Sequence, residues 1–260
     1  MNIQSKDCTL TVAKDGELIP LPYSEETIRL ASKGYVLPGV IGERNREKHV
    51  ITGETIQRCF VTRLEYLNVL PLFLLLFKHD DKFDIYTDRV CEKSIYKNLT
   101  VKQFELRAEN KEAFHLKIEV DSNDDSFLTE WPITIPELKW EQKRTYIFDG
   151  HNVISDLKTL PLIYRFELTG SFTEKSKYQI KLYFPLSKEH YPQQKKIDKL
   201  QIQIDNSNGI TIEFTDLQPV GNLTDVYCAN TILCYQEFNI LSEIILSIKN
   251  KMENLIVMLN

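Results

Sequence analysis

The stretch TIQRCFVTRLEY, from Thr55 to Tyr66, decides the fold. Its side chains alternate between two faces along the whole stretch, which is longer than the ~5–6 residues of a typical strand. Ile56, Phe60 and Leu64 fall on one face, and Cys59 and Val61 on the other. The sequence therefore predicts one long strand around which a larger sheet is built.

An apolar run, LPLFLLLF, follows at Leu70–Phe77. A transmembrane helix needs ~20 apolar residues, so this run is too short to span a bilayer and predicts a buried helical turn. Alternating apolar residues then predict strands at Asp84–Thr87, Leu99–Arg107 and Phe114–Val120. These strands would form a meander with one apolar side.

The second half of the chain consists of short alternating runs separated by turns such as Asp149-Gly150. Regularly spaced short strands are typical of a β-sandwich or barrel. The sequence thus predicts a mainly β fold, a β-sandwich or barrel with a short flanking helix. The further strands are expected at Trp131–Ile135, Lys143–Phe148, Leu160–Leu168, Tyr178–Phe184, Lys199–Ile204 and Ile210–Phe214.

The C-terminal segment has a different, helical spacing. Apolar residues recur at steps of four and three, the spacing of a heptad seam, and Asn239 is available as a helix cap. The pattern predicts a C-terminal helix that packs either on the β core of its own chain or on a helix of another subunit. The seam consists of Leu241, Ile245, Ile248, Met252, Leu255 and Leu259.

These patterns divide the chain into three parts. Residues 1–30 contain prolines that favour an extended segment, and they predict an N-terminal arm. Residues 31–222 predict the β domain, with halves at 31–121 and 127–222. Residues 223–260 predict a mostly helical segment.

Composition excludes several classes of protein. The 260 residues carry a formal net charge of −5, whereas a domain that binds DNA or RNA tightly needs a basic surface. The five cysteines include no CxxC pair, and no apolar leader precedes them, so we expect reduced thiols in a cytosol-like compartment. The chain is expected to be folded, without a membrane-spanning segment.

Motifs that carry chemistry are missing from the sequence. The glycines match no phosphate-binding loop, and neither HExxH nor GxSxG occurs. Asp121, Asn123 and Asp125 resemble the start of an EF-hand loop, but Ser126 replaces its glycine and Pro132 its bidentate glutamate. We therefore predict no catalytic residue, no metal site and no cofactor, and a protein that is not an enzyme.

The order of features from Lys33 to Pro219 resembles tail tube proteins of long-tailed bacteriophages. A glycine-bearing segment and a charged tip precede the long strand, and a short Leu-rich run, a hairpin and two alternating strands follow it. Later strands at Tyr146–Phe148 and Leu162–Leu168 complete the pattern. The residues that carry the resemblance are Gly34–Arg46, Val50–Tyr66, Leu70–Phe77 and Tyr96–Val120. The C-terminal heptad segment is a departure from that family.

The resemblance implies a structural subunit of a phage or a phage-like gene-transfer particle. In that family, subunits form hexameric rings that stack into a tube with a continuous inner β-barrel. DNA passes through the lumen without specific binding, and the partners are the chain itself and other tail proteins. The subunit would reside in the virion tail, and in the host cytoplasm during assembly. The N-terminal arm would reach a neighbouring subunit, and the ring-to-ring or subunit contacts would be made by Glu43, Arg44, Arg46, Glu47 and Lys48.

An alternative hypothesis is that the chain is a β-sandwich module of a baseplate or adhesin that binds a carbohydrate or protein ligand. Exposed aromatic side chains would favour it, and the candidates are Trp131, Trp140 and the segment Tyr178–Tyr191. Packing across strands in the core is the competing role for these rings.

Overall fold

Strands dominate the chain, which confirms the predicted mainly β fold. The computed structural model describes residues 9–21, 23–26, 29–37, 48–63, 69–77, 81–88, 93–122, 127–128, 145–156, 162–172, 176–185, 196–205, 210–228, 231–248 and 253–258. All the strand pairings within these ranges are antiparallel. The first half contains β1 (Thr9–Lys14), β2 (Glu17–Leu21), β3 (Tyr23–Glu26), β4 (Arg29–Leu37), β5 (Lys48–Arg63), α1 (Val69–Phe77), β6 (Phe83–Asp88), β7 (Lys93–Glu109), β8 (His115–Ser122) and β9 (Phe127–Leu128).

The second half is also made of strands. It contains a short 3-10 helix at Gly150–Asn152, β10 (Val153–Ser155), β11 (Arg165–Ser171), β12 (Lys177–Pro185), β13 (Ile197–Asp205), β14 (Ile210–Cys228), β15 (Thr231–Ile240), β16 (Glu243–Ile248) and β17 (Glu253–Met258).

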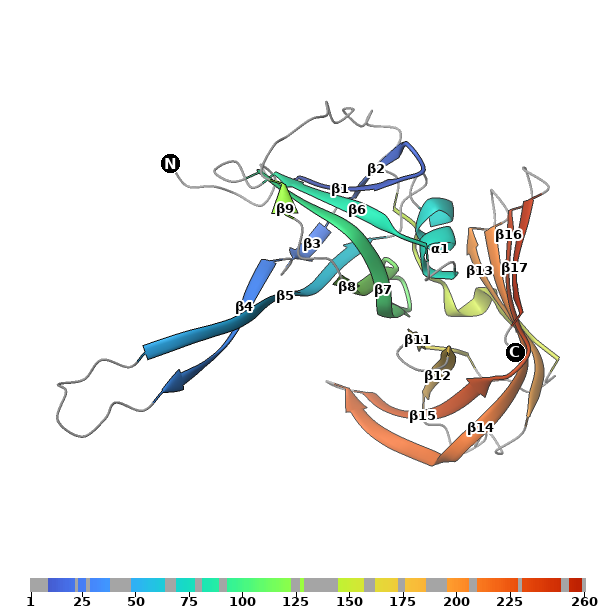
Figure 1. The fold of residues 1–260 in the computed structure, drawn as a ribbon. Coiled ribbons are helices and arrows are strands. Elements are labelled where there is room, and N and C mark those ends of the chain that lie inside the picture. Colours follow the sequence, from blue (N-terminus) through green and yellow to red (C-terminus); the bar gives the residue numbers. More distant parts are fainter. Residues whose placement is uncertain are drawn as a thin grey trace.

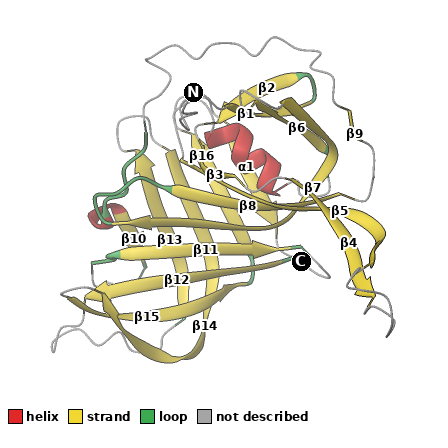
Figure 2. Cartoon of the chain, turned by 90° about the vertical axis from the view of Figure 1, so that its left-hand side faces the viewer, coloured by secondary structure: helices red, strands yellow, loops and turns green. Residues whose placement is uncertain are grey.

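One sheet, which we call the front sheet, runs through both halves. Its strands pair in the order β3, β5, β8, β7, β11, β12, β15 and β14. Figure 2 shows β8, β11, β12 and β15 side by side, with β13 crossing behind them. The pairing of β7 with β11 joins the two halves, so the front sheet is continuous from one end of the molecule to the other.

The chain turns from the front sheet into a second layer along two long strands. Residues Ile210–Leu217 of β14 pair with β13, whereas its later residues pair with β15. Between these parts Asp216 has a left-handed φ of 57°, and such a residue lets the strand bend sharply. Figure 1 shows the resulting curvature of β14 and β15. β7 bends in the same way between its pairing with β6 and its pairing with β11.

Helix α1 is the buried element predicted from the apolar run Leu70–Phe77. Leu72, Phe73, Leu75 and Leu76 are all buried, because a helix with apolar residues on every side has no surface suited to water. The last helical residue, Phe77, packs its ring edge against Phe104 of β7 at 6.3 Å between centroids. The helix thus fills the interior behind the front sheet.

The core is a single hydrophobic cluster that includes residues from β1 through β16. At the joint between the halves, Phe104 of β7 contacts Tyr178 of β12 and Phe172, with ring centroids 6.3 and 6.1 Å apart. A second aromatic group also joins the halves. The rings of Phe114, Phe148 and Phe166 contact one another, with centroids 5.2–5.9 Å apart. The two halves therefore share one core.

Tyr178 should make the free energy of unfolding fall at alkaline pH. Burial raises the pKa of its phenol to about 12 from 10.0, so the folded state holds the neutral form. The stabilisation is complete below pH 10 and is lost as the pH rises toward 12, by at most about 2.7 kcal/mol. We expect Tyr178→Phe to lose less unfolding free energy over this window than the unaltered chain, measured by urea titrations at each pH. Equal losses would show that Tyr178 does not carry the effect.

The two halves have the same strand topology. In the first half the order is β1, β6, β7, β8, β5 and then β3 with β4. In the second half it is β10, β13, β14, β15, β12 and β11. The strands also follow one another along the chain in the same way. We call these two units the first and second repeat.

Backbone details coincide at equivalent positions of the repeats. Leu99 in β7 pairs with both β6 and β8, and Leu217 in β14 pairs with both β13 and β15. Both leucines are buried. The residue before each has a left-handed φ, 55° at Asn98 and 57° at Asp216. Two unrelated strands rarely share such a detail, so the repeats are one structural unit used twice.

The first repeat carries a feature that the described part of the second lacks. β4 pairs with residues Lys48–Gln57 of β5, and this hairpin projects away from the rest of the molecule (Figure 1). In the second repeat, the hairpin of β11 and β12 ends at Ser171 and Lys177. We call the β4–β5 extension the hairpin arm.

The predicted C-terminal helix is wrong, because the described residues of that segment form the strands β15 (Thr231–Ile240), β16 (Glu243–Ile248) and β17 (Glu253–Met258). Leu241, the first residue of the proposed seam, is 43% exposed, whereas Ile244 and Leu246 are buried. From Glu243 to Ser247 every second residue is buried, which is a strand pattern. The same segment also fits the four-three spacing of a helix seam. Pairing of β16 with β14 and β17 supplied backbone hydrogen bonds that decided between them.

The predicted domain boundaries fall inside the sheet. Within the expected N-terminal arm, residues 1–30, β1 pairs with β2 and β6, and Leu10, Val12 and Leu21 join the core. The boundary expected at 222 lies within β14. Both segments are thus built into the fold wherever the structure describes them.

Candidate functional site

The most extensive candidate surface among the described residues is the outer face of the front sheet, opposite the core. Along β11, the Phe104–Glu109 part of β7 and the Lys177–Leu182 part of β12, every second side chain is buried, and the alternate ones reach this outer face. One row across the strands reads Arg107, Glu167, Lys181 and Glu237, each directly opposite the next. Side chains of opposite charge therefore alternate across the sheet.

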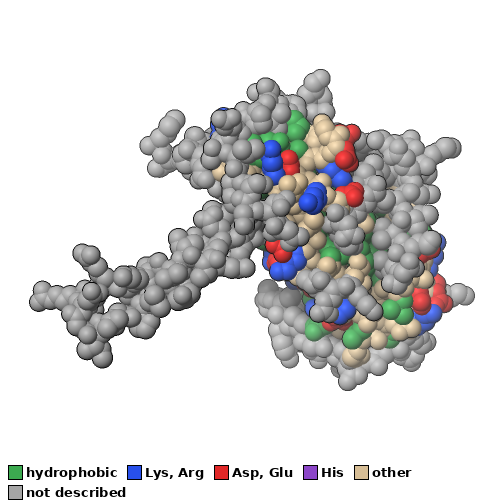
Figure 3. Space-filling view, viewed as in Figure 1, with side chains coloured by type: hydrophobic (Ala, Val, Ile, Leu, Met, Phe, Trp, Pro, Cys, Tyr) green, Lys and Arg blue, Asp and Glu red, His purple; other side chains and the backbone are tan. Residues whose placement is uncertain are grey.

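The other charged side chains of this face continue the mixture. Glu105 and Lys117 are direct partners between β7 and β8, as are Glu109 and Arg165 between β7 and β11. Figure 3, which views the molecule from another side, also shows basic and acidic side chains interspersed among the described residues. A surface of this kind presents little net field to a charged partner.

The most ordered part of the outer face is a cluster on β11 and β12. Arg165 forms an ion pair with Glu167, and its guanidinium lies 5.0 Å from the ring centroid of Tyr183. The Tyr183 hydroxyl donates a 2.9 Å hydrogen bond to the second carboxylate oxygen of Glu167. Burial and the Glu167 charge raise the pKa of Tyr183. The cluster is held by its own contacts, which leave Glu167 both ion-paired and hydrogen-bonded.

His115 of β8 stands between two arginines of the same face. It pairs across the strands with Arg63 of β5 and Arg107 of β7. Partial burial and the charges of Arg107 and Arg63 lower its pKa. The imidazole is therefore neutral at pH 7 and adds no charge to the row.

The two ends of the front sheet are strand edges with no partner among the described residues. At one end, β3 pairs with β5 on one side only. At the other end, Thr224–Cys228 of β14 pair with β15 on one side only. Val220, which lies beside this second edge, is 37% exposed. Unpaired backbone at a strand edge is a ready template for another strand.

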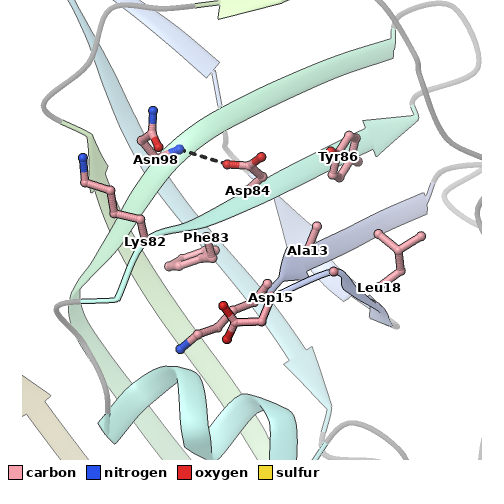
Figure 4. Close-up of a pocket in the computed structure, with 10 residues that line it drawn as sticks. Ala13, Asp15, Leu18, Lys82, Phe83, Asp84, Tyr86 and Asn98 are labelled. Carbon is pink, nitrogen blue, oxygen red and sulfur yellow. Dashed lines mark hydrogen bonds between the residues drawn. The ribbon is translucent and has the colours of Figure 1, made fainter.

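An open pocket of about 390 Å³ lies at the turn between β1 and β2. Figure 4 shows that Asp84 points toward Asn98, whose backbone N–H donates to it at 3.0 Å. The amine of Lys82 points away from Asp15 in the same view. Lys14 forms an ion pair with Asp81 at 2.8 Å. The polar groups thus do not converge on one point, and the pocket gives no basis for a ligand site.

The described ranges hold neither a metal cluster nor a helix that could cross a membrane. Within them, no group of three or more His, Cys, Asp or Glu side chains could hold a metal ion. None of the helices described there has both the length and the apolar character needed to cross a bilayer.

The contact residues predicted from the sequence lie mostly outside the described residues. Glu43, Arg44, Arg46 and Glu47 belong to the loop that joins β4 to β5, of which the structure describes nothing. Lys48 is the first residue of β5 and pairs with Leu37. By chain connectivity, this loop closes the hairpin arm.

The aromatic candidates for ligand binding divide in the same way. Trp131 and Trp140 lie outside the described residues. Tyr178 is buried in the core, whereas Tyr183, 8% exposed, is covered within the outer-face cluster with Arg165 and Glu167. They offer no exposed stacking platform.

Sequence reasoning missed the charged outer face of the front sheet. A signal was present, because Lys177, Gln179 and Lys181 alternate with apolar residues along β12. That alternation identifies the polar side of one strand, but it does not show which strands lie side by side.

Comparison with known proteins leaves the geometry as the only guide to function, since no family model and no curated protein matches this sequence.

Proposed function

We propose that this chain is the structural subunit of a phage-like tail tube, in which copies join edge to edge into rings and the rings stack around a lumen for DNA. The observation that carries the proposal is the front sheet, which is continuous across the molecule and ends in two edges without described partners. Identical copies can extend such a sheet by head-to-tail pairing, which closes into a ring if the rotation between copies permits it.

In this proposal the outer face of the front sheet lines the lumen, and the charges on that face support the assignment. Its basic residues, such as Arg107 and Lys181, stand directly opposite Glu167 and Glu237. Tight binding to DNA requires lysines and arginines that release counterions from phosphates. Basic side chains that stand directly opposite carboxylates hold DNA weakly, so a duplex could slide past them.

Size also favours this arrangement. Each repeat contributes roughly four strands to the front sheet, and neighbouring strands lie about 4.8 Å apart. A closed wall of six repeats, the number of tube domains in the rings of the family that the sequence resembles, has a backbone diameter on the order of 40 Å. Such a barrel leaves an open channel between the side chains of opposite walls.

The hairpin arm is the proposed contact between rings. It projects from the body, and the charged loop with Glu43, Arg44, Arg46 and Glu47 connects its two strands. A projecting hairpin can reach a neighbouring ring without disturbing the core from which it extends.

The mass of the purified chain in solution tests the proposal. We expect light scattering to show oligomers that grow with concentration, and negative-stain images of the same sample to show rings or hollow tubes. The physical reason is that two complementary strand edges gain backbone hydrogen bonds on association. A strict monomer at every concentration and salt level would contradict the proposal and favour the ligand-binding sandwich.

A charge-reversal variant separates ring formation from stacking. Arg44→Glu combined with Arg46→Glu should leave single rings intact while shortening or abolishing tubes. A matched control is Lys97→Glu, which changes one charge in β7 at a position away from the hairpin arm. Loss of rings as well as tubes in the Arg44 and Arg46 variant would place these residues within a ring instead.

A further inference from the structure

The chain contains one complete example of how its repeats join. Residues Gln103–Glu109 of β7, in the first repeat, pair with Arg165–Ser171 of β11, in the second. This segment of β7 lies on the same strand edge as β6, beyond the point where that pairing ends at Leu99. The joint between repeats is therefore an antiparallel strand pairing of seven residue pairs.

The equivalent of β7 in the second repeat has this same edge without a described partner. In β14, pairing with β13 ends at Leu217, the counterpart of Leu99. We align the two strands by counting residues along their partners, β8 and β15. Arg107 pairs seven residues along β8 from the partner of Leu99, and Val226 pairs seven residues along β15 from the partner of Leu217. By the same count, Cys228 takes the place of Glu109. The edge of β14 at Thr224–Cys228 thus corresponds to the part of β7 that binds β11.

The equivalent of β11 in the first repeat likewise has an edge without a described partner. Val61 of β5 pairs with Glu25, as Tyr183 of β12 pairs with Arg165. Thr55 pairs with Ala31, as Lys177 pairs with Ser171. Glu25 and Ala31 therefore occupy the places of Arg165 and Ser171.

From these equivalences we infer that the β3–β4 edge of a second copy of this chain, beginning at Glu25, pairs with Thr224–Cys228 of β14 and so repeats the part of the β7–β11 joint made by Glu105–Glu109. Because Glu109 lies opposite Arg165 within the chain, Cys228 of one chain lies opposite Glu25 of the next. The exposed Val220 beside this edge is then covered.

The number of chains in a ring follows, and this step rests on the proposed tail tube function. The same joint within and between chains relates all successive repeats by one rotation, so a ring that holds six repeats contains three chains. The hexameric ring expected from the resemblance is thereby replaced by a trimer of two-repeat chains. Its mass is three times 30.4 kDa and not six times.

Disulfide trapping tests the register. The Cα atoms of directly opposite residues in an antiparallel pair lie about 4.5–5.5 Å apart, within the range that a disulfide spans. We expect Glu25→Cys to form an interchain disulfide with the native Cys228 when assembled rings are mildly oxidised. On a non-reducing denaturing gel the ladder should end at three chains.

Two matched controls make the result specific. Glu26→Cys lies one residue further along β3, on the opposite face of the strand, and should not cross-link to Cys228. Glu25→Cys combined with Cys228→Ser should lose the ladder even though the other cysteines remain. Native mass spectrometry of rings from the unaltered chain measures the chain number without any substitution.

The outcomes separate this inference from the function on which it rests. Rings of three chains with the Glu25→Cys ladder support it. Rings that contain six chains, or rings in which Glu26→Cys cross-links as well as Glu25→Cys, overturn the inference and leave the tube standing. A chain that stays monomeric overturns both.

Discussion

Replacement of Phe104 by alanine is expected to lower the free energy of unfolding by about 3–5 kcal/mol. Phe104 is 3% exposed in β7, and its ring contacts Phe77 of α1, Phe172 and Tyr178. Truncation leaves a cavity where the helix and both repeats meet, and these elements cannot collapse together without disrupting the front sheet. Unfolding in guanidinium chloride, followed by circular dichroism, measures the loss.

A nearby position tests whether the effect belongs to the ring. Lys102, two residues before Phe104, is exposed, so Lys102→Ala should change stability by less than about 0.5 kcal/mol. A loss below about 1 kcal/mol for Phe104→Ala would mean that the joint between repeats depends on the backbone pairing of β7 with β11 rather than on this aromatic contact.

The second large effect is expected at Gly150, at the start of the 3-10 helix. A Cβ added there would lie 1.9 Å from the carbonyl oxygen of Ile163, a backbone atom that no rotamer change can move. The Gly150 N–H also donates to the side chain of Asn110 in the β7–β8 turn, at 3.1 Å. We therefore expect Gly150→Ala to cost about 3 kcal/mol, the upper part of the range for overpacking, in the same unfolding measurement.

His151→Ala provides the control for Gly150. His151 is exposed, and the hydrogen bond that Asp149 accepts comes from its backbone N–H, which alanine retains. Its stability should therefore match that of the unaltered chain. Equal stabilities for Gly150→Ala and His151→Ala would show that the 3-10 helix can shift away from Ile163 at little cost.

The sequence predicted elements whose pattern has one interpretation. The alternation in Thr55–Tyr66 identified the strand that ends at Arg63, and LPLFLLLF identified α1. The C-terminal error arose where two periodicities overlapped, because Ile244 and Leu246 fit a strand while Ile245 and Ile248 fit a helix seam. Backbone pairing with β14 decided the outcome, and such pairing leaves no local mark in the sequence.

The internal repeat could not be found from the residues. Equivalent positions carry different side chains, such as Arg58 and Ile180, or Glu26 and Phe166. What the repeats share is backbone geometry, including the left-handed residue before Leu99 and Leu217, and either asparagine or aspartate adopts that conformation readily. The open edges of the candidate site were hidden for the same reason, since an edge is defined by what does not pair with it.

Covalent linkage of the two repeats also changes how an assembly would begin. Separate units meet only by diffusion, whereas two units on one chain see each other at an effective concentration on the order of millimolar. In the proposed ring, half of the joints would form during folding, before any encounter between chains. The two units are also free to diverge, and the hairpin arm, present on the first alone, is a specialisation that two identical copies of a single unit could not have acquired.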